Sequence, residues 1–127
     1  MATAVWVDDG QEQAVDLFNT ATRGGVSVSY FGGWGSGSTA AAVSDTALES
    51  ENPESRVATT ESQPAANTWR NVFEITATGN RVVNEAAILD ASSSGNLILR
   101  GTHATLNIET GDRVEYTFDL LFKDQSE

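Results

Sequence analysis

The strongest constraint on the fold is a run of alternating apolar and polar residues at the end of the chain. In the segment RVEYTFDLLF, residues 113–122, apolar side chains occupy every second position: Val114, Tyr116, Phe118 and Leu120. Arginine, acids and threonine fill the positions between them. In an extended strand this spacing puts all the apolar side chains on one face. The segment is therefore predicted to be a strand with one face in the core and one in water.

Three further strands are predicted before it. TWRNVFEITATG is rich in strand-forming residues and ends at the turn Gly79-Asn80. RVVNEAAILDA and LILRGTHATLNIE meet across SSSGN, as the two arms of a hairpin do, and Gly111-Asp112 makes the next turn. Several short strands at this spacing predict a mainly β chain, either an antiparallel β-sandwich or a jelly-roll-like domain.

The whole chain of 127 residues fits a single domain, residues 1–127. Its first half is less regular than the second. Residues 1–10 are either an extended N-terminal arm or the first strand. Residues 9–22 space their apolar side chains as one short N-terminal helix does, and residues 26–30 alternate like a strand. Four glycines within seven residues then predict a glycine-rich and acidic loop over residues 31–55.

The charge is strongly negative, with eighteen acids against seven bases and a formal net charge of -11. Six of the seven bases are arginine, and Lys123 is the only lysine. Molar salt screens such a surface, since the Debye length falls to about 3 Å at 1 M. A halophilic protein and an ordinary acidic protein are both compatible with this composition. Scattered bases among acids argue against a nucleic-acid partner, and no apolar run reaches the roughly 20 residues of a membrane-spanning helix.

No residue pattern predicts catalysis or a cofactor. The only histidine, His103, has no nucleophile motif near it, so we interpret it as a surface or hydrogen-bonded strand residue. The glycine-rich GWGSGS lacks the lysine of a phosphate-binding loop. The acids of the predicted loop are weak candidates for a hard-cation site, and their alternative is a solvated acidic loop. These acids are Asp45, Glu49, Glu51 and Glu54.

Aromatic residues in the first third are candidates for contacts with another subunit, because aromatics are common interface anchors. The candidates are Trp6, Phe18, Phe31 and Trp34, and for Trp34 a place in the core is the alternative. A carbohydrate-binding β domain would display aromatics on a wet strand face. Trp69, Phe73, Tyr116 and Phe118 instead fall at positions that predict the core.

Three strings give the chain a resemblance to a family of small structural proteins of tailed phages. They are WGSGSTAAAVSDTALESE, EAAILDASSSGNLILRG and GDRVEYTFDLLF. With the acidic, lysine-poor composition, the resemblance implies a structural protein of a haloarchaeal tailed virus, located in the virion and without enzymatic activity.

The resemblance implies a decoration or turret protein on the outside of the capsid. The alternative is a tail or fibre-associated structural protein. The implied partners are other virion proteins, either the major capsid protein or neighbouring decoration or turret subunits, and the chain is expected to form a homo-oligomer.

Overall fold

A computed structural model describes Val15 and residues 29–122, and these fold into two antiparallel sheets. The first sheet has the strand order β2-β1-β5-β6 and the second the order β3-β4-β7. The strands are β1 (Phe31–Gly35), β2 (Val57–Ala58), β3 (Thr60–Ala65), β4 (Thr68–Thr76), β5 (Arg81–Leu89), β6 (Leu97–Ile108) and β7 (Arg113–Leu121).

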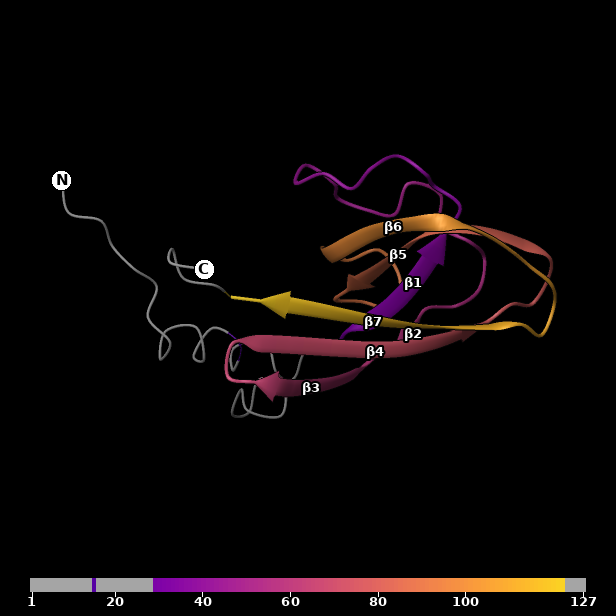
Figure 1. Ribbon diagram of the computed structural model, residues 1–127. Helices are drawn as coiled ribbons and strands as arrows, with labels where there is room; N and C mark the ends of the chain where they lie inside the picture. Colours follow the sequence, from indigo (N-terminus) through magenta and orange to yellow (C-terminus); the bar gives the residue numbers. More distant parts are fainter. Residues whose placement is uncertain (1–14, 16–28, 123–127) are drawn as a thin grey trace.

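The two sheets lie face to face as a sandwich, with β1, β5 and β6 in one layer and β3, β4 and β7 in the other (Figure 1). The core between them is aromatic and aliphatic: Trp34, Trp69, Phe73, Ile75, Val83 and Ile88 are at most 3% exposed. The predicted mainly β, antiparallel sandwich is confirmed.

The predicted turns and hairpin are confirmed as well. β5 and β6 pair antiparallel across the turn that contains Ser94 and Gly95, which both have positive φ (52° and 74°). The turns at residues 79–80 and 111–112 connect strands of different sheets, so the chain crosses between layers there. In β7 half-buried and exposed residues alternate along the whole strand, as the sequence predicts.

The loop predicted for residues 31–55 is wrong at its start, because Phe31–Gly35 is strand β1, between β2 and β5. Its glycines fit close packing rather than a bend. A Cβ on Gly32 would overlap the Phe73 ring from the opposite sheet, and a Cβ on Gly35 would overlap the backbone of Ser50. Glycine is therefore needed where backbones and rings approach closely.

Residues 36–55 form no strand and arch over the outer face of the first sheet (Figure 1). They cover β5, which is buried from Val83 to Leu89. On that outer face Leu48 of the arch packs with Ala87 and Leu89 of β5. The segment 36–55, called the arch below, thus makes β5 a strand with protein on both faces.

The N-terminal predictions fall largely outside the described residues. This holds for the arm or first strand at residues 1–10 and for the strand at 26–30 apart from its last two residues, of which Tyr30 is buried directly before β1. Of the helix predicted at residues 9–22 only Val15 is described, and its side chain is buried in the core. Within the described part of the chain no helix is long and apolar enough to cross a membrane.

Candidate functional site

The most elaborate polar arrangement of the described residues fixes the arch to the first sheet. Its centre is Glu85 on β5, whose side chain is 0% exposed. The backbone N–H groups of Gly37 and Ser50 donate to Glu85 Oε2, and that of Glu49 donates to Oε1, each at 2.8 Å. One buried carboxylate thereby satisfies backbone donors from both ends of the arch.

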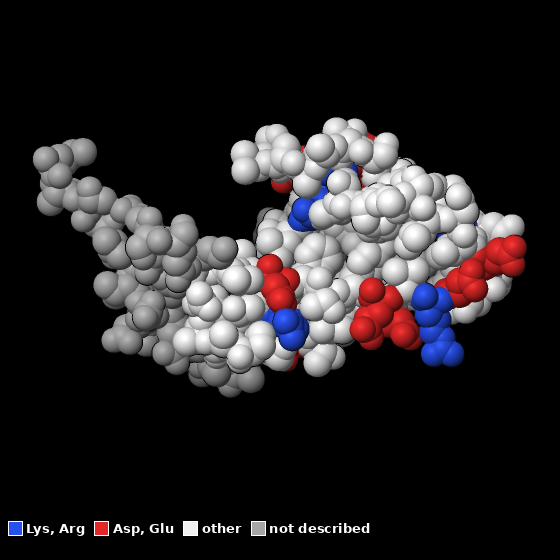
Figure 2. Space-filling model, viewed as in Figure 1, with Lys and Arg blue, Asp and Glu red and all other residues white. Residues whose placement is uncertain are grey.

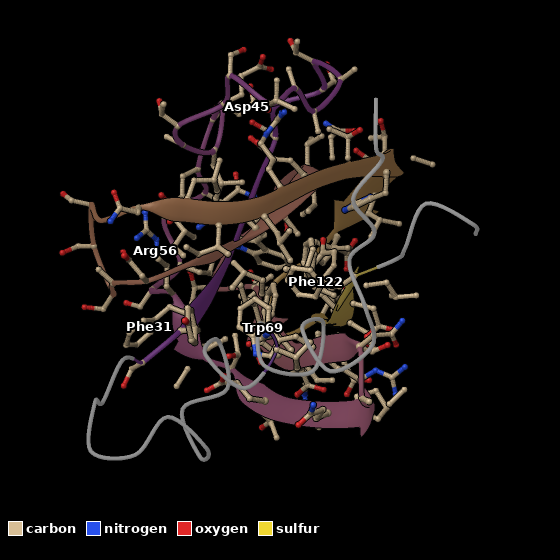
Figure 3. All side chains as sticks on the ribbon, turned by 90° about the vertical axis from the view of Figure 1, so that its left-hand side faces the viewer. Phe31, Asp45, Arg56, Trp69 and Phe122 are labelled. Carbon is tan, nitrogen blue, oxygen red and sulfur yellow. The ribbon has the colours of Figure 1, made fainter. Side chains whose placement is uncertain are left out.

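Arg100 on the neighbouring strand β6 completes the arrangement. Its Nε donates to Glu85 Oε1 and its Nη1 to Asp45 Oδ2, both at 2.9 Å. Its Nη2 donates to the Thr39 carbonyl at 3.0 Å, and its side chain is 3% exposed. Glu85, Arg100 and Asp45 therefore form a charge chain that runs from the buried Glu85 and Arg100 on the sheet to the partly exposed Asp45 in the arch, which Figure 3 shows above the strands.

The charges in this chain favour each other's ionised forms. Burial raises the pKa of Glu85, but hydrogen bonds from the Ser50 and Glu49 N–H groups and from Arg100 outweigh it, so its pKa is lowered overall. The hydrogen bond to Glu85 is the largest cause of the raised pKa of Arg100. All three groups therefore stay charged at neutral pH, and none is poised to exchange a proton.

A polar hollow of about 320 Å³ lies above this chain. Arch residues from Thr39 to Glu49 line it together with Arg100. The backbone N–H groups of Ser38 and Thr39 donate to Glu49 Oε1, at 3.0 and 3.4 Å. The charged groups around the hollow thus already have partners, Asp45 with Arg100 and Glu49 with backbone N–H groups, and the arrangement is suited to holding the arch rather than to chemistry.

Glu54 fixes the far end of the arch. Its Oε1 accepts a 2.9 Å hydrogen bond from the Trp34 indole, and its Oε2 accepts bonds from the Thr78 N–H, the Thr78 hydroxyl and Arg81 Nε. Burial raises its pKa, but the bonds from Thr78 and Trp34 outweigh this and lower the pKa to about 2. Glu54 ties β1 to the turn between β4 and β5.

Arg56 fixes the hairpin turn next to the arch. It forms a two-point ion pair with Glu51, at 2.8 and 2.9 Å, and its Nη1 donates to the carbonyls of Ala91 and Ser94. The Arg56 side chain is 8% exposed, and the hydrogen bond to Glu51 raises its pKa. One arginine thus links the arch to the β5–β6 turn.

The acids predicted as weak cation ligands do not converge on one point. Asp45 pairs with Arg100, Glu49 accepts backbone N–H groups, Glu51 pairs with Arg56, and Glu54 binds Trp34, Thr78 and Arg81. Within residues 29–122 and Val15, no group of three or more potential ligands is placed to hold a metal ion. The alternative interpretation, a solvated acidic loop, is wrong for Glu54, which is only 8% exposed.

The aromatic interface candidates have different outcomes. Trp34 is 1% exposed and lies in the core, so of its two predicted places the core is correct. Phe31 on β1 is partly buried. Trp6 and Phe18 lie outside the described residues.

His103 is a hydrogen-bonded strand histidine, as predicted. It lies on β6 with Nε2 2.8 Å from the Tyr116 hydroxyl and Nδ1 2.8 Å from the Ala104 carbonyl. Burial raises the pKa of Tyr116 to about 12. The phenol therefore stays protonated at neutral pH and offers His103 a neutral partner.

The sequence reasoning missed Glu85 and Arg100. The signal for Glu85 was an acid inside the mostly apolar strand RVVNEAAIL, since a carboxylate that is buried in such a strand needs a partner. No comparable signal identified its backbone partners in the arch, which lie 35 to 48 residues away, or Arg100, which lies 15 residues away.

No protein-family model matches the chain, and a search of curated proteins gives no match.

Proposed function

We propose that this chain is a non-enzymatic structural protein of a virus particle, which decorates or stabilises the outside of a tailed-virus capsid in high salt. The resemblance of three strings to small tailed-phage structural proteins is the starting point. Its proposed location is the particle surface. Its proposed partners there are the major capsid protein or neighbouring copies.

One structural observation supports the proposal in addition to those strings. Residues 34–51 hold the first string and residues 85–101 the second, and the Glu85–Arg100–Asp45 chain joins the two into one unit. The charges of this unit hold the arch on the first sheet. A protein whose work is to keep its shape on a particle surface needs that kind of rigidity, and fully paired buried charges support a structural role.

The lowered pKa values of the buried acids also support a structural role. The buried acids Glu54 and Glu85 have lowered pKa values, whereas a catalytic acid at neutral pH needs a raised one. His103 hydrogen-bonds with the Ala104 carbonyl and with the hydroxyl of Tyr116, whose pKa is raised, and neither of these partners is a carboxylate.

A carbohydrate-binding domain is disfavoured by where the aromatic side chains lie. Trp69 is 0% exposed between the two layers, and Figure 3 shows it there. Phe73 is 3% exposed and stacks on Tyr116. Aromatics held inside the sandwich leave no stacking platform for a sugar ring on these strands.

A tail or fibre-associated position remains the alternative within the structural class. Immunogold electron microscopy of purified virions in molar salt, with mass spectrometry of the same particles, separates the two. Gold over the heads supports decoration or a turret, and gold confined to tails supports the fibre alternative. Washed virions without the protein would refute the structural proposal, and antibody preabsorbed with the purified protein is the control.

A further inference from the structure

Residues 39–44, called the arch tip below, carry the most exposed large apolar side chain of the described residues. All six residues of the arch tip are exposed, and the four from Ala40 to Val43 are apolar. Val43 is completely exposed, whereas the next large apolar side chain of the described part, Leu121, is 46% exposed. A run of three or four exposed apolar residues is unfavourable in water unless it has a function.

The arch tip is held in one shape. Residues 42–45 form a turn, in which the Asp45 N–H donates to the Ala42 carbonyl at 3.0 Å and the Ala42 N–H donates to Asp45 Oδ2 at 2.9 Å. The same oxygen accepts from Arg100 Nη1, and Arg100 Nη2 donates to the Thr39 carbonyl. A segment fixed at both ends presents Val43 without first having to be ordered, which lowers the entropic cost of binding.

The arch tip is also convex and uncharged. Figures 1 and 2 show the arch projecting above the first sheet as a mostly white surface, while acidic and basic side chains gather along the lower rim of the molecule. The sequence has no charged residue from position 36 to position 44. A convex apolar surface of this kind is complementary to an apolar pocket on a partner.

The hollows on the described residues do not suit the Val43 side chain of a second copy. One hollow of about 320 Å³ lies within the arch itself, over Arg100. Another of about 320 Å³ lies between the start of β5 and the end of β6, and four of its six lining residues are polar or charged: Asn80, Arg81, Asn107 and Glu109. Two copies, each with a formal charge of -11, also repel each other. The arch tip is therefore matched to a different protein.

The charge around the arch tip indicates the chemistry of that partner. Glu49 is exposed beside the tip, where it accepts the N–H groups of Ser38 and Thr39, and the whole chain is strongly acidic. Basic groups at the rim of the pocket complement this charge. In molar salt the Debye length is about 3 Å, so charges attract only at contact and apolar burial supplies most of the affinity.

We propose that the arch tip is the contact with the capsid shell, and that Val43 inserts into an apolar, basic-rimmed pocket of the major capsid protein. This inference rests on the proposed function and deepens it by naming the surface that touches the shell.

Sedimentation of the purified protein with capsid shells that lack it, in molar KCl, tests the contact. The wild type is expected to bind. Val43→Glu should bind at least about tenfold more weakly, because it places a carboxylate in an apolar pocket. Val82→Glu is the matched control, since it makes the same change at a valine that is 45% exposed on β5, and it should bind like the wild type. Shells that do not bind the wild type, or that bind Val43→Glu as tightly as Val82→Glu, overturn the proposal.

A photo-cross-link identifies the partner without relying on affinity. The chain contains no cysteine, so Val43→Cys introduces a single thiol that can carry a benzophenone. Illumination on the shells should link this label to the major capsid protein, and the same label at Val82→Cys should link far less. Because Val43 is completely exposed, both of its variants should keep the urea unfolding midpoint of the wild type. Links formed mainly with a second copy of the chain contradict the proposal.

The two proposals fail separately. A protein that is missing from washed virions refutes the capsid role and the shell contact with it. A protein that is present on virions, and whose Val43→Glu variant binds shells as well as the wild type, keeps the capsid role and refutes the contact through the arch tip.

Discussion

Replacing Glu85 by glutamine is the sharpest test of what holds the arch in place. The substitution keeps the shape of the side chain but removes its charge and one of its two acceptor oxygens. Arg100 then faces an amide in a site where its side chain is 3% exposed, and at least one of the arch N–H groups loses its acceptor. Removing one partner of a buried ion pair costs about 3–5 kcal/mol. That is a large part of the roughly 5–15 kcal/mol that stabilises a typical domain.

Urea unfolding in molar KCl, followed by tryptophan fluorescence, measures the effect. With a slope of about 1.5 kcal/mol per molar urea, the loss moves the midpoint down by about 2–3 M. Glu115→Gln is the matched control, since it removes the same charge from an exposed position of β7 and is expected to change stability by less than about 0.5 kcal/mol. If Glu85→Gln unfolds at the same urea concentration as Glu115→Gln, the buried charge chain does not hold the arch, and the reasoning above is wrong.

Three further predictions concern acid, packing and salt. The pKa of Glu54 is lowered from 4.5 to about 2, so its contribution is present above pH 4.5 and is lost as the pH falls toward 2. The melting temperature of the wild type should fall over that range by more than that of Glu54→Gln. Gly32→Ala should lower the free energy of unfolding by about 1–3 kcal/mol through overlap with Phe73. Gly101→Ala should cost less in the same urea titration, because its added Cβ would lie 3.8 Å from the Phe118 ring, an ordinary contact distance. Because the net charge is -11, the melting temperature should rise steadily between low and molar KCl, and a flat salt titration would contradict the halophilic interpretation.

The later strands could be predicted because their signals are local. Alternation fixes which side chains of β7 face the core, and the Ser94-Gly95 turn fixes the β5–β6 hairpin. Each signal lies within about ten neighbouring residues. Sequence reasoning works where the pattern and the turn chemistry agree.

The first half could not be predicted as well, because its structure depends on distant contacts. The glycines of FGGWG predict a bend, yet they lie in strand β1. There Phe73 lies too close to Gly32, and Ser50 too close to Gly35, for either glycine to carry a side chain. The site was hidden for the same reason. Arg100 was one of several scattered arginines, and only the fold brings it against Glu85 and Asp45.

The arch also has a consequence for hydrogen exchange. The amides of Gly37, Glu49 and Ser50 lie outside any strand, where amides usually exchange quickly with solvent. Here they donate to the buried Glu85 carboxylate, so each can exchange only when the arch lifts from β5 and that ionic contact breaks. These three amides should therefore exchange together and slowly, as one cooperative unit with the strand beneath them.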